Sequence, residues 1–101
     1  RQVEAEGIDG TIYSHPIGYH GHGAGTWIGA WESQKPAPGR GDYRIDPSTA
    51  WSIELNAQKN VPEWGNQKVR FMHEENGFLS PDGTFRFLDG GQEEFILLPR
   101  P

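Results

Sequence analysis

The sequence predicts an α+β domain that is dominated by an antiparallel β-sheet. Two long stretches, residues 49–57 and 68–79, alternate between two faces in the way of half-buried strands. Turn signals rich in Gly, Pro and Asp separate these stretches from shorter ones. Only residues 1–6 at the start of the chain are good helix formers. At 101 residues the chain has the length of one small domain.

The first half of the chain offers short elements. Residues 1–6 predict the end of a helix, with Gly7 as its stop. Asp9-Gly10 is a turn signal and residues 11–13 form a short extended run. Residues 27–31 follow as a short strand or bend. Residues 32–47 carry three of the eight prolines and predict a surface loop.

The second half of the chain predicts a run of strands joined by turns. Residues 49–57 place Glu54 in the middle of a strand that also carries Trp51, Ile53 and Leu55. A turn over residues 62–66 leads to the long strand 68–79. Three further elements are expected in order: a turn at residues 80–83, a strand at 84–88 and a last strand at 94–98.

Composition excludes several classes of function. The net charge of −5 disfavours nucleic-acid binding, which needs a basic surface. No apolar run approaches the ~18 residues that a membrane-spanning helix needs. There is no Cys, so a metal site would have to consist of imidazole and carboxylate groups. The cellular compartment stays open.

A cluster of histidines makes residues 15–22 the first candidate site. His15, His20 and His22 lie within these eight residues, and Gly18 and Gly21 lie between them. Histidine is the commonest metal ligand and a ready proton carrier at neutral pH. The alternative interpretation is a solvated, glycine-rich loop.

Glutamates inside the predicted strands form the second candidate feature. Glu54 and either Glu74 or Glu75 lie mid-strand, where a carboxylate is costly unless it is paired or metal-bound. Strand alternation places Glu74 and Glu75 on opposite faces, so only one of them can join Glu54. The alternative is that these glutamates face solvent on the wet side of an antiparallel sheet.

The histidine cluster and the mid-strand glutamates, in this order and spacing, resemble the motifs of a metallopeptidase family. That family contains aminopeptidase P, prolidase and methionine aminopeptidase, and creatinase is related to it in fold. His15-Pro16-Ile17-Gly18 followed by His22 matches H-x-x-G-x-x-x-H. Trp51-Ser52-Ile53-Glu54-Leu55 stands where the family has a strand ending in T-I-E-P. Met72-His73-Glu74-Glu75-Asn76 stands for R-I-E-[DE]-[DT], and Gly83 has the family's spacing from Glu74, which favours Glu74 over Glu75.

The resemblance implies a role for each matched residue. His15 and Glu54 would bind one divalent ion, and Glu74 would bridge two ions (Mn, Zn, Co or Fe). Glu54 would also act as the general base, and His22 would contact the scissile carbonyl. The implied fold is the C-terminal portion of the curved creatinase-like (pita-bread) sheet, and the implied activity is Xaa-Pro aminopeptidase-like or prolidase-like hydrolysis. The departures from the family pattern are Leu55-Asn56, where Pro-Gly is usual, and Met72, where an arginine is usual.

Two aspartate ligands of that family have no counterpart in this sequence. We therefore expect residues 1–101 to be the C-terminal segment of a catalytic domain, inactive alone. The family's helices that cover the outer face of the sheet are almost absent from this segment, so exposed apolar surface is also expected. The segment would associate with an N-terminal half or form a homo-oligomer, and the complete site would act on a peptide, with proline the expected residue at the cleaved bond. The alternative function is a catalytically inactive creatinase-fold binding module. A free-standing His- and Trp-rich β module would leave the order of the three motifs unexplained.

Overall fold

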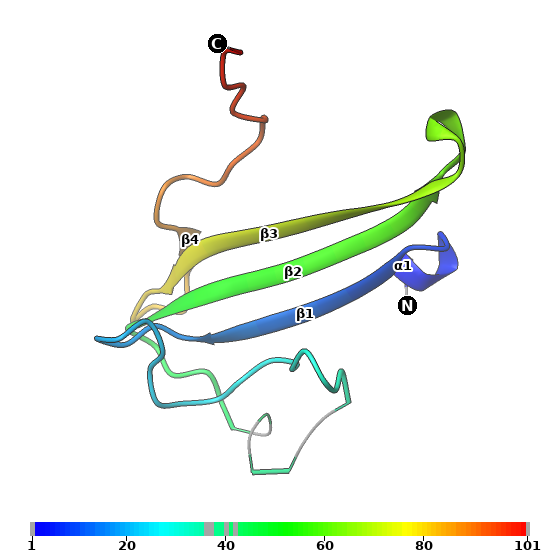
Figure 1. Ribbon diagram of the computed structural model, residues 1–101. Coiled ribbons are helices and arrows are strands. Elements are labelled where there is room, and N and C mark those ends of the chain that lie inside the picture. Colours follow the sequence, from blue (N-terminus) through cyan, green and yellow to red (C-terminus); the bar gives the residue numbers. More distant parts are fainter. Residues whose placement is uncertain (1, 36–37, 40, 42, 101) are drawn as a thin grey trace.

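Four antiparallel strands form a single sheet in the order β1-β2-β3-β4 (Figure 1). This is a computed structural model, and it describes residues 2–35, 38–39, 41 and 43–100. The strands are β1 (Asp9–Pro16), β2 (Thr49–Val61), β3 (Gln67–Leu79) and β4 (Phe85–Phe87). Helix in the described part amounts to α1 (Gln2–Ala5) and the 3-10 turn η1 (Pro62–Trp64), and neither is long enough to cross a membrane. The prediction of a mainly antiparallel sheet is confirmed.

The long β2–β3 hairpin is the centre of the sheet. Each strand has 13 residues, and the register runs unbroken from Thr49 opposite Leu79 to Val61 opposite Gln67. Gly65 and Asn66 turn the chain with φ angles of 70° and 58°. The strand predicted to end at Ala57 continues to Val61 because its polar residues 58–60 still pair with β3.

Two sequence predictions about strands are wrong. Asp9 and Gly10 do not turn the chain but begin β1, where they lie opposite Gln58 and Ala57. The Gln58 side chain donates to the Asp9 carboxylate, which accounts for a polar residue at this position. Residues 94–98 form no strand, because Gly90 and Gly91 with positive φ angles of 82° and 80° turn the chain away after β4.

The two faces of the sheet differ in character. Directly opposite residues share a face, so Tyr13, Glu54 and Glu74 lie on one side, which is largely polar. Ile53 and Leu55 lie on the other side, which is largely apolar. Even there burial is shallow, and Trp51 is the only buried hydrophobic side chain among the described residues.

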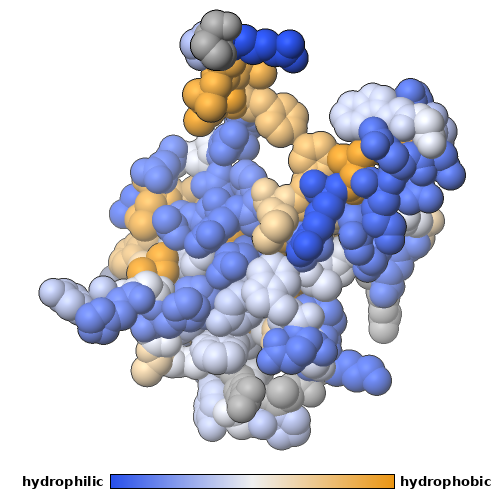
Figure 2. Space-filling model, viewed as in Figure 1, coloured by the Kyte–Doolittle hydropathy of each residue, from blue (hydrophilic) through white to orange (hydrophobic). Residues whose placement is uncertain are grey.

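Apolar surface is exposed over much of the molecule, as the sequence predicted. A run of four consecutive exposed side chains lies in the C-terminal segment, where Phe95, Ile96, Leu97 and Leu98 are 77% to 88% accessible. Figure 2 shows hydrophobic side chains gathered on this segment, near the C-terminus at the top of the view. Soluble domains rarely leave such patches uncovered unless they bind something. Association itself stays a prediction.

Candidate functional site

The structure brings His15, Glu54 and Glu74 to one face of three neighbouring strands. His15 is the penultimate residue of β1, Glu54 lies near the middle of β2, and Glu74 lies in β3. Glu54 and Glu74 are directly opposite each other, and His15 lies opposite Ser52, two residues before Glu54. Residues two apart in a strand share a face, so the three side chains gather on the polar side of the sheet.

His15 is buried and fixed by contacts at both ring nitrogens. Its Nδ1 lies 2.9 Å from the carbonyl oxygen of Pro16, and its Nε2 lies 3.0 Å from Oε1 of Glu54. A carbonyl oxygen can only accept, so Nδ1–H is the donor to Pro16. In a neutral imidazole this leaves the lone pair of Nε2 facing an ionised carboxylate, which also only accepts. A cation, either a proton or a metal ion, is needed between these two atoms.

Glu74 is positioned by a residue that the sequence analysis did not identify. The buried Ser52 hydroxyl donates to Oε1 of Glu74 at 2.7 Å. Ser52 precedes Glu54 by two residues, so strand alternation was a signal that could have placed it on the same face. Within the described residues no Lys or Arg forms a salt bridge with either glutamate. Among the described residues, the two facing carboxylates therefore have no lysine or arginine partner.

His22 returns to His15 through the glycine loop. The two imidazole rings stack with centroids 4.0 Å apart and planes 12° apart. A Cβ on Gly18 would lie 2.6 Å from the carbonyl oxygen of His22, so the loop closes this tightly only with glycine there. His20 is exposed and contacts the ring of Tyr19 instead. The spacing of His15, Gly18 and His22 thus has a structural reason.

An aromatic group borders the same site. The Tyr13 ring contacts His15 and two indoles, with centroid distances of 5.1 Å to His15, 5.8 Å to Trp27 and 5.7 Å to Trp31. Burial, the Glu54 carboxylate and the Glu32 carboxylate all raise the pKa of Tyr13 above 10.0.

A shallow hollow of about 230 Å³ opens beside the two glutamates. Its lining includes Trp31, Glu54, Met72 and Glu74. An aromatic wall next to two carboxylates is a suitable surface for a small cationic or metal-bound ligand. Met72 lies in this lining at the position where the metallopeptidase pattern has an arginine.

Glu75 and His73 lie on the opposite, apolar face. His73 Nε2 is 3.3 Å from Oε1 of Glu75, and the backbone N–H of Gln92 donates to the same oxygen at 2.7 Å. The sequence left Glu74 and Glu75 as rival candidates. The register resolves which one shares a face with Glu54, because Glu74 is directly opposite it and Glu75 is opposite Ile53.

The donor chemistry fits a divalent ion, although the side chains are not gathered into a ligand shell. One imidazole and two carboxylates suit Zn, Mn, Fe or Co. In the described part of the chain, no group of three His, Cys, Asp or Glu side chains converges closely enough to hold a metal ion. His15 and Glu54 contact each other instead, and Glu74 contacts Ser52.

Comparisons with known proteins do not name a relative. No family model matches this chain, and neither curated proteins nor solved structures give a match.

Proposed function

We propose that this chain carries part of the divalent-metal site of a metallopeptidase on a creatinase-like fold. The proposed reaction is hydrolysis of an Xaa-Pro peptide, as in proteins similar to aminopeptidase P or prolidase. One observation carries the proposal: His15 Nε2 faces Oε1 of Glu54 at 3.0 Å while Nδ1 is committed to a carbonyl oxygen. Metal-binding histidines commonly have this arrangement, in which one ring nitrogen donates to a carbonyl and the other is left for the ion.

Each residue of the site has a definable part in this proposal. His15, Glu54 and Glu74 would hold the metal, which when bound lowers the pKa of a coordinated water and polarises a carbonyl. Ser52 orients Glu74, and the Pro16 carbonyl orients His15. Glu54 would also act as the general base that accepts a proton from the attacking water. His22, exposed above His15, is placed to contact a substrate carbonyl.

Three protein ligands cannot hold the two ions that the resemblance implies. We therefore propose that further carboxylates come from polypeptide outside residues 1–101, and that these residues alone bind metal weakly and do not hydrolyse Xaa-Pro peptides. Measurable Xaa-Pro hydrolysis by the 101-residue chain with added Mn²⁺ would show that this part of the proposal is wrong.

Paramagnetic broadening by Mn²⁺ tests the site directly. Low concentrations of Mn²⁺ should broaden the backbone amide signals of His15, Glu54 and Glu74 before those of other residues. Glu54→Gln keeps the shape of the side chain and removes its charge, and it should weaken Mn²⁺ binding by at least about tenfold.

Two control variants separate this site from non-specific binding to an acidic protein. His20→Ala removes an exposed histidine of the same cluster, and Glu75→Gln removes a carboxylate from the opposite face. Both should keep the broadening pattern and the affinity. Equal losses in Glu54→Gln and His20→Ala, or broadening spread evenly over all acidic residues, would refute the site assignment.

A further inference from the structure

The two edges of the sheet differ in how their backbone groups are satisfied. Along the outer edge of β1, Ser14 exchanges two backbone hydrogen bonds of 2.8 Å with Ile28, and the Pro16 carbonyl accepts from Gly23. At Ile12 the side-chain amide of Gln34 makes the hydrogen bonds that a neighbouring strand would make. It accepts from the Ile12 N–H at 2.9 Å and donates to the Ile12 carbonyl at 3.0 Å. This edge is covered from Ile12 to Pro16.

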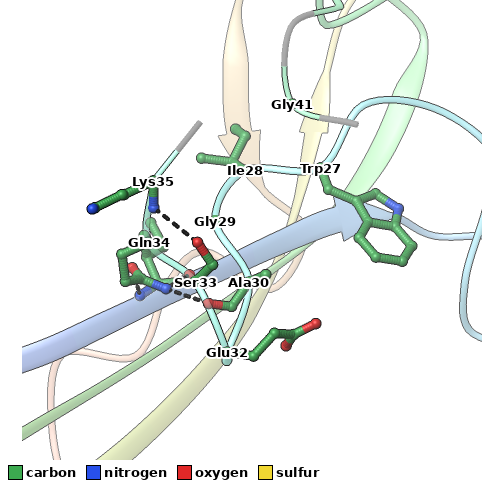
Figure 3. A pocket seen from close by; sticks show the side chains of 10 residues that line it. Trp27, Ile28, Gly29, Ala30, Glu32, Ser33, Gln34, Lys35 and Gly41 are labelled. Atoms are coloured by element: carbon green, nitrogen blue, oxygen red, sulfur yellow. Dashed lines mark hydrogen bonds between the residues drawn. The ribbon is translucent and has the colours of Figure 1, made fainter. Parts of the chain in front are cut away.

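Figure 3 shows how the segment after β1 makes this cover. The Gln34 amide also donates to the Ala30 carbonyl at 2.6 Å, which fixes its orientation toward the strand. Edge strands invite pairing with other chains, and proteins commonly protect them by such devices.

Among the described residues, the outer edge of β3 is covered only at its C-terminal end. β4 pairs with Gly77, Phe78 and Leu79, and the Leu88 N–H donates to the Asn76 carbonyl. Since backbone groups of alternate residues point to the same edge, the open edge continues through the even-numbered residues before Asn76. These four residues are Lys68, Arg70, Met72 and Glu74.

The outward N–H and C=O groups of these four residues have no hydrogen-bond partner within the described part of the chain. The C-terminal segment contacts β3 through side chains of its apolar face and not through this edge. Phe95 lies against Phe71 with ring centroids 6.2 Å apart, and the Gln92 N–H donates to the Glu75 carboxylate. No proline interrupts residues 67–76, so the backbone can still add a strand.

We propose that a second copy of this chain pairs with β3 as an antiparallel strand, about a two-fold axis perpendicular to the sheet. In the proposed register Lys68 lies opposite the partner's Glu74, Arg70 opposite the partner's Met72, and Phe71 opposite the partner's Phe71. Opposite charges then face each other at both ends, and an aromatic pair lies at the centre on the apolar face. The proposal goes beyond the proposed function and rests on other observations, namely the open backbone groups of β3 and the charges along this edge, although both proposals involve the Glu74 carboxylate.

Two arguments select this register. In this register the outward N–H and C=O groups of all four open residues face a partner in each copy. No backbone group that is already hydrogen-bonded is needed for the pairing. Shifting the two-fold axis by one residue would set Arg70 opposite the partner's Glu74. It would also set Lys68 opposite the partner's Asn76, whose carbonyl is already bonded to Leu88. The proposed register therefore combines full pairing with charge complementarity.

A single introduced cysteine tests the register, because the chain has no cysteine of its own. Phe71→Cys places two thiols directly opposite each other, and mild oxidation should convert most of the protein into a disulfide-linked dimer. Val69→Cys is the matched control on the same face. Its two copies would be offset by four residues, about 13 Å along the strand, and should not cross-link. Equal cross-linking of both variants, or none of Phe71→Cys, overturns the register.

Charge reversal tests the interface in the chain without cysteine. The unmodified protein should sediment at twice the 11.3 kDa chain mass and dissociate on dilution. Lys68→Glu sets like charges opposite each other twice and should weaken the dimer at least tenfold, and adding Glu74→Lys should restore it. A monomer at all concentrations would mean that the C-terminal segment or nothing fills the edge, and it would overturn the proposal. Failure of the double variant to rescue would do the same. Both results concern the dimer alone, and the double variant is not used to measure Mn²⁺ binding because it also removes Glu74, a proposed metal ligand.

Discussion

Replacement of Gly29 by alanine should detach the segment that covers the edge of β1. Gly29 has a φ angle of +73°, and a Cβ there would lie 2.1 Å from the carbonyl oxygen of Ile12. That oxygen belongs to a strand backbone and also accepts from Gln34, so it cannot move without disturbing the sheet edge. The substitution thus introduces an unfavourable backbone conformation and a steric clash together.

The expected cost follows from these two contributions. A left-handed conformation costs a non-glycine residue about 1–2 kcal/mol, and overpacking against a rigid neighbour adds about 1–3 kcal/mol. The free energy of unfolding should therefore fall by about 2–5 kcal/mol. Gly83→Ala is the matched control, because Gly83 has a φ angle of +84° and nothing within 4 Å of the added Cβ. Its free energy of unfolding should fall only by the cost of the left-handed conformation, about 1–2 kcal/mol.

Urea unfolding followed by circular dichroism measures both variants in the same way. The difference between them isolates the clash with Ile12. Equal losses for the two substitutions would refute the close approach of the segment to β1. A larger loss for Gly83→Ala would show that the turn before β4, rather than this cover, limits the stability of the sheet.

Two further predictions concern the tryptophans and Tyr13. Trp51→Ala should lower the free energy of unfolding by about 3–5 kcal/mol, since the Trp51 side chain is buried. Trp64 is exposed, and Trp64→Ala should change it by less than about 0.5 kcal/mol in the same urea assay. Glu54→Gln and Glu32→Gln should each bring the pKa of Tyr13 closer to 10.0 in an ultraviolet titration of phenolate. The raised pKa favours the neutral phenol in the folded state, so stability should fall as the pH rises from about 10 through the folded pKa.

The alternation of faces along the long strands could be predicted from the sequence because it follows a local rule. Alternating residues placed Glu54 and Glu74 mid-strand and separated Glu74 from Glu75. The register of β2 against β3 then made Glu54 and Glu74 direct neighbours, and no single stretch of sequence contains that information. The arrangement of His15 and His22 around Gly18 followed the spacing of the motif.

Other parts of the structure depend on contacts that the local pattern does not contain. Asp9-Gly10 has the composition of a turn, yet pairing with β2 extends it into a strand. Residues 94–98 have strand-like composition, yet they gain no partner in the sheet. Ser52 and Tyr13 contribute to the site through cross-strand neighbours, so their roles appear only once the register is known.

The Gln34 amide has a kinetic consequence for the sheet edge. It holds the Ile12 N–H with a side chain rather than with a second strand, so rotation of one side chain is enough to expose that proton to solvent. The Ile12 amide should exchange its hydrogen through this local opening, many times faster than the amides shared by β2 and β3, which need the hairpin to separate. The sheet edge at Ile12 can therefore open and close by rotation of the Gln34 side chain, while the pairing of β1, β2 and β3 stays intact.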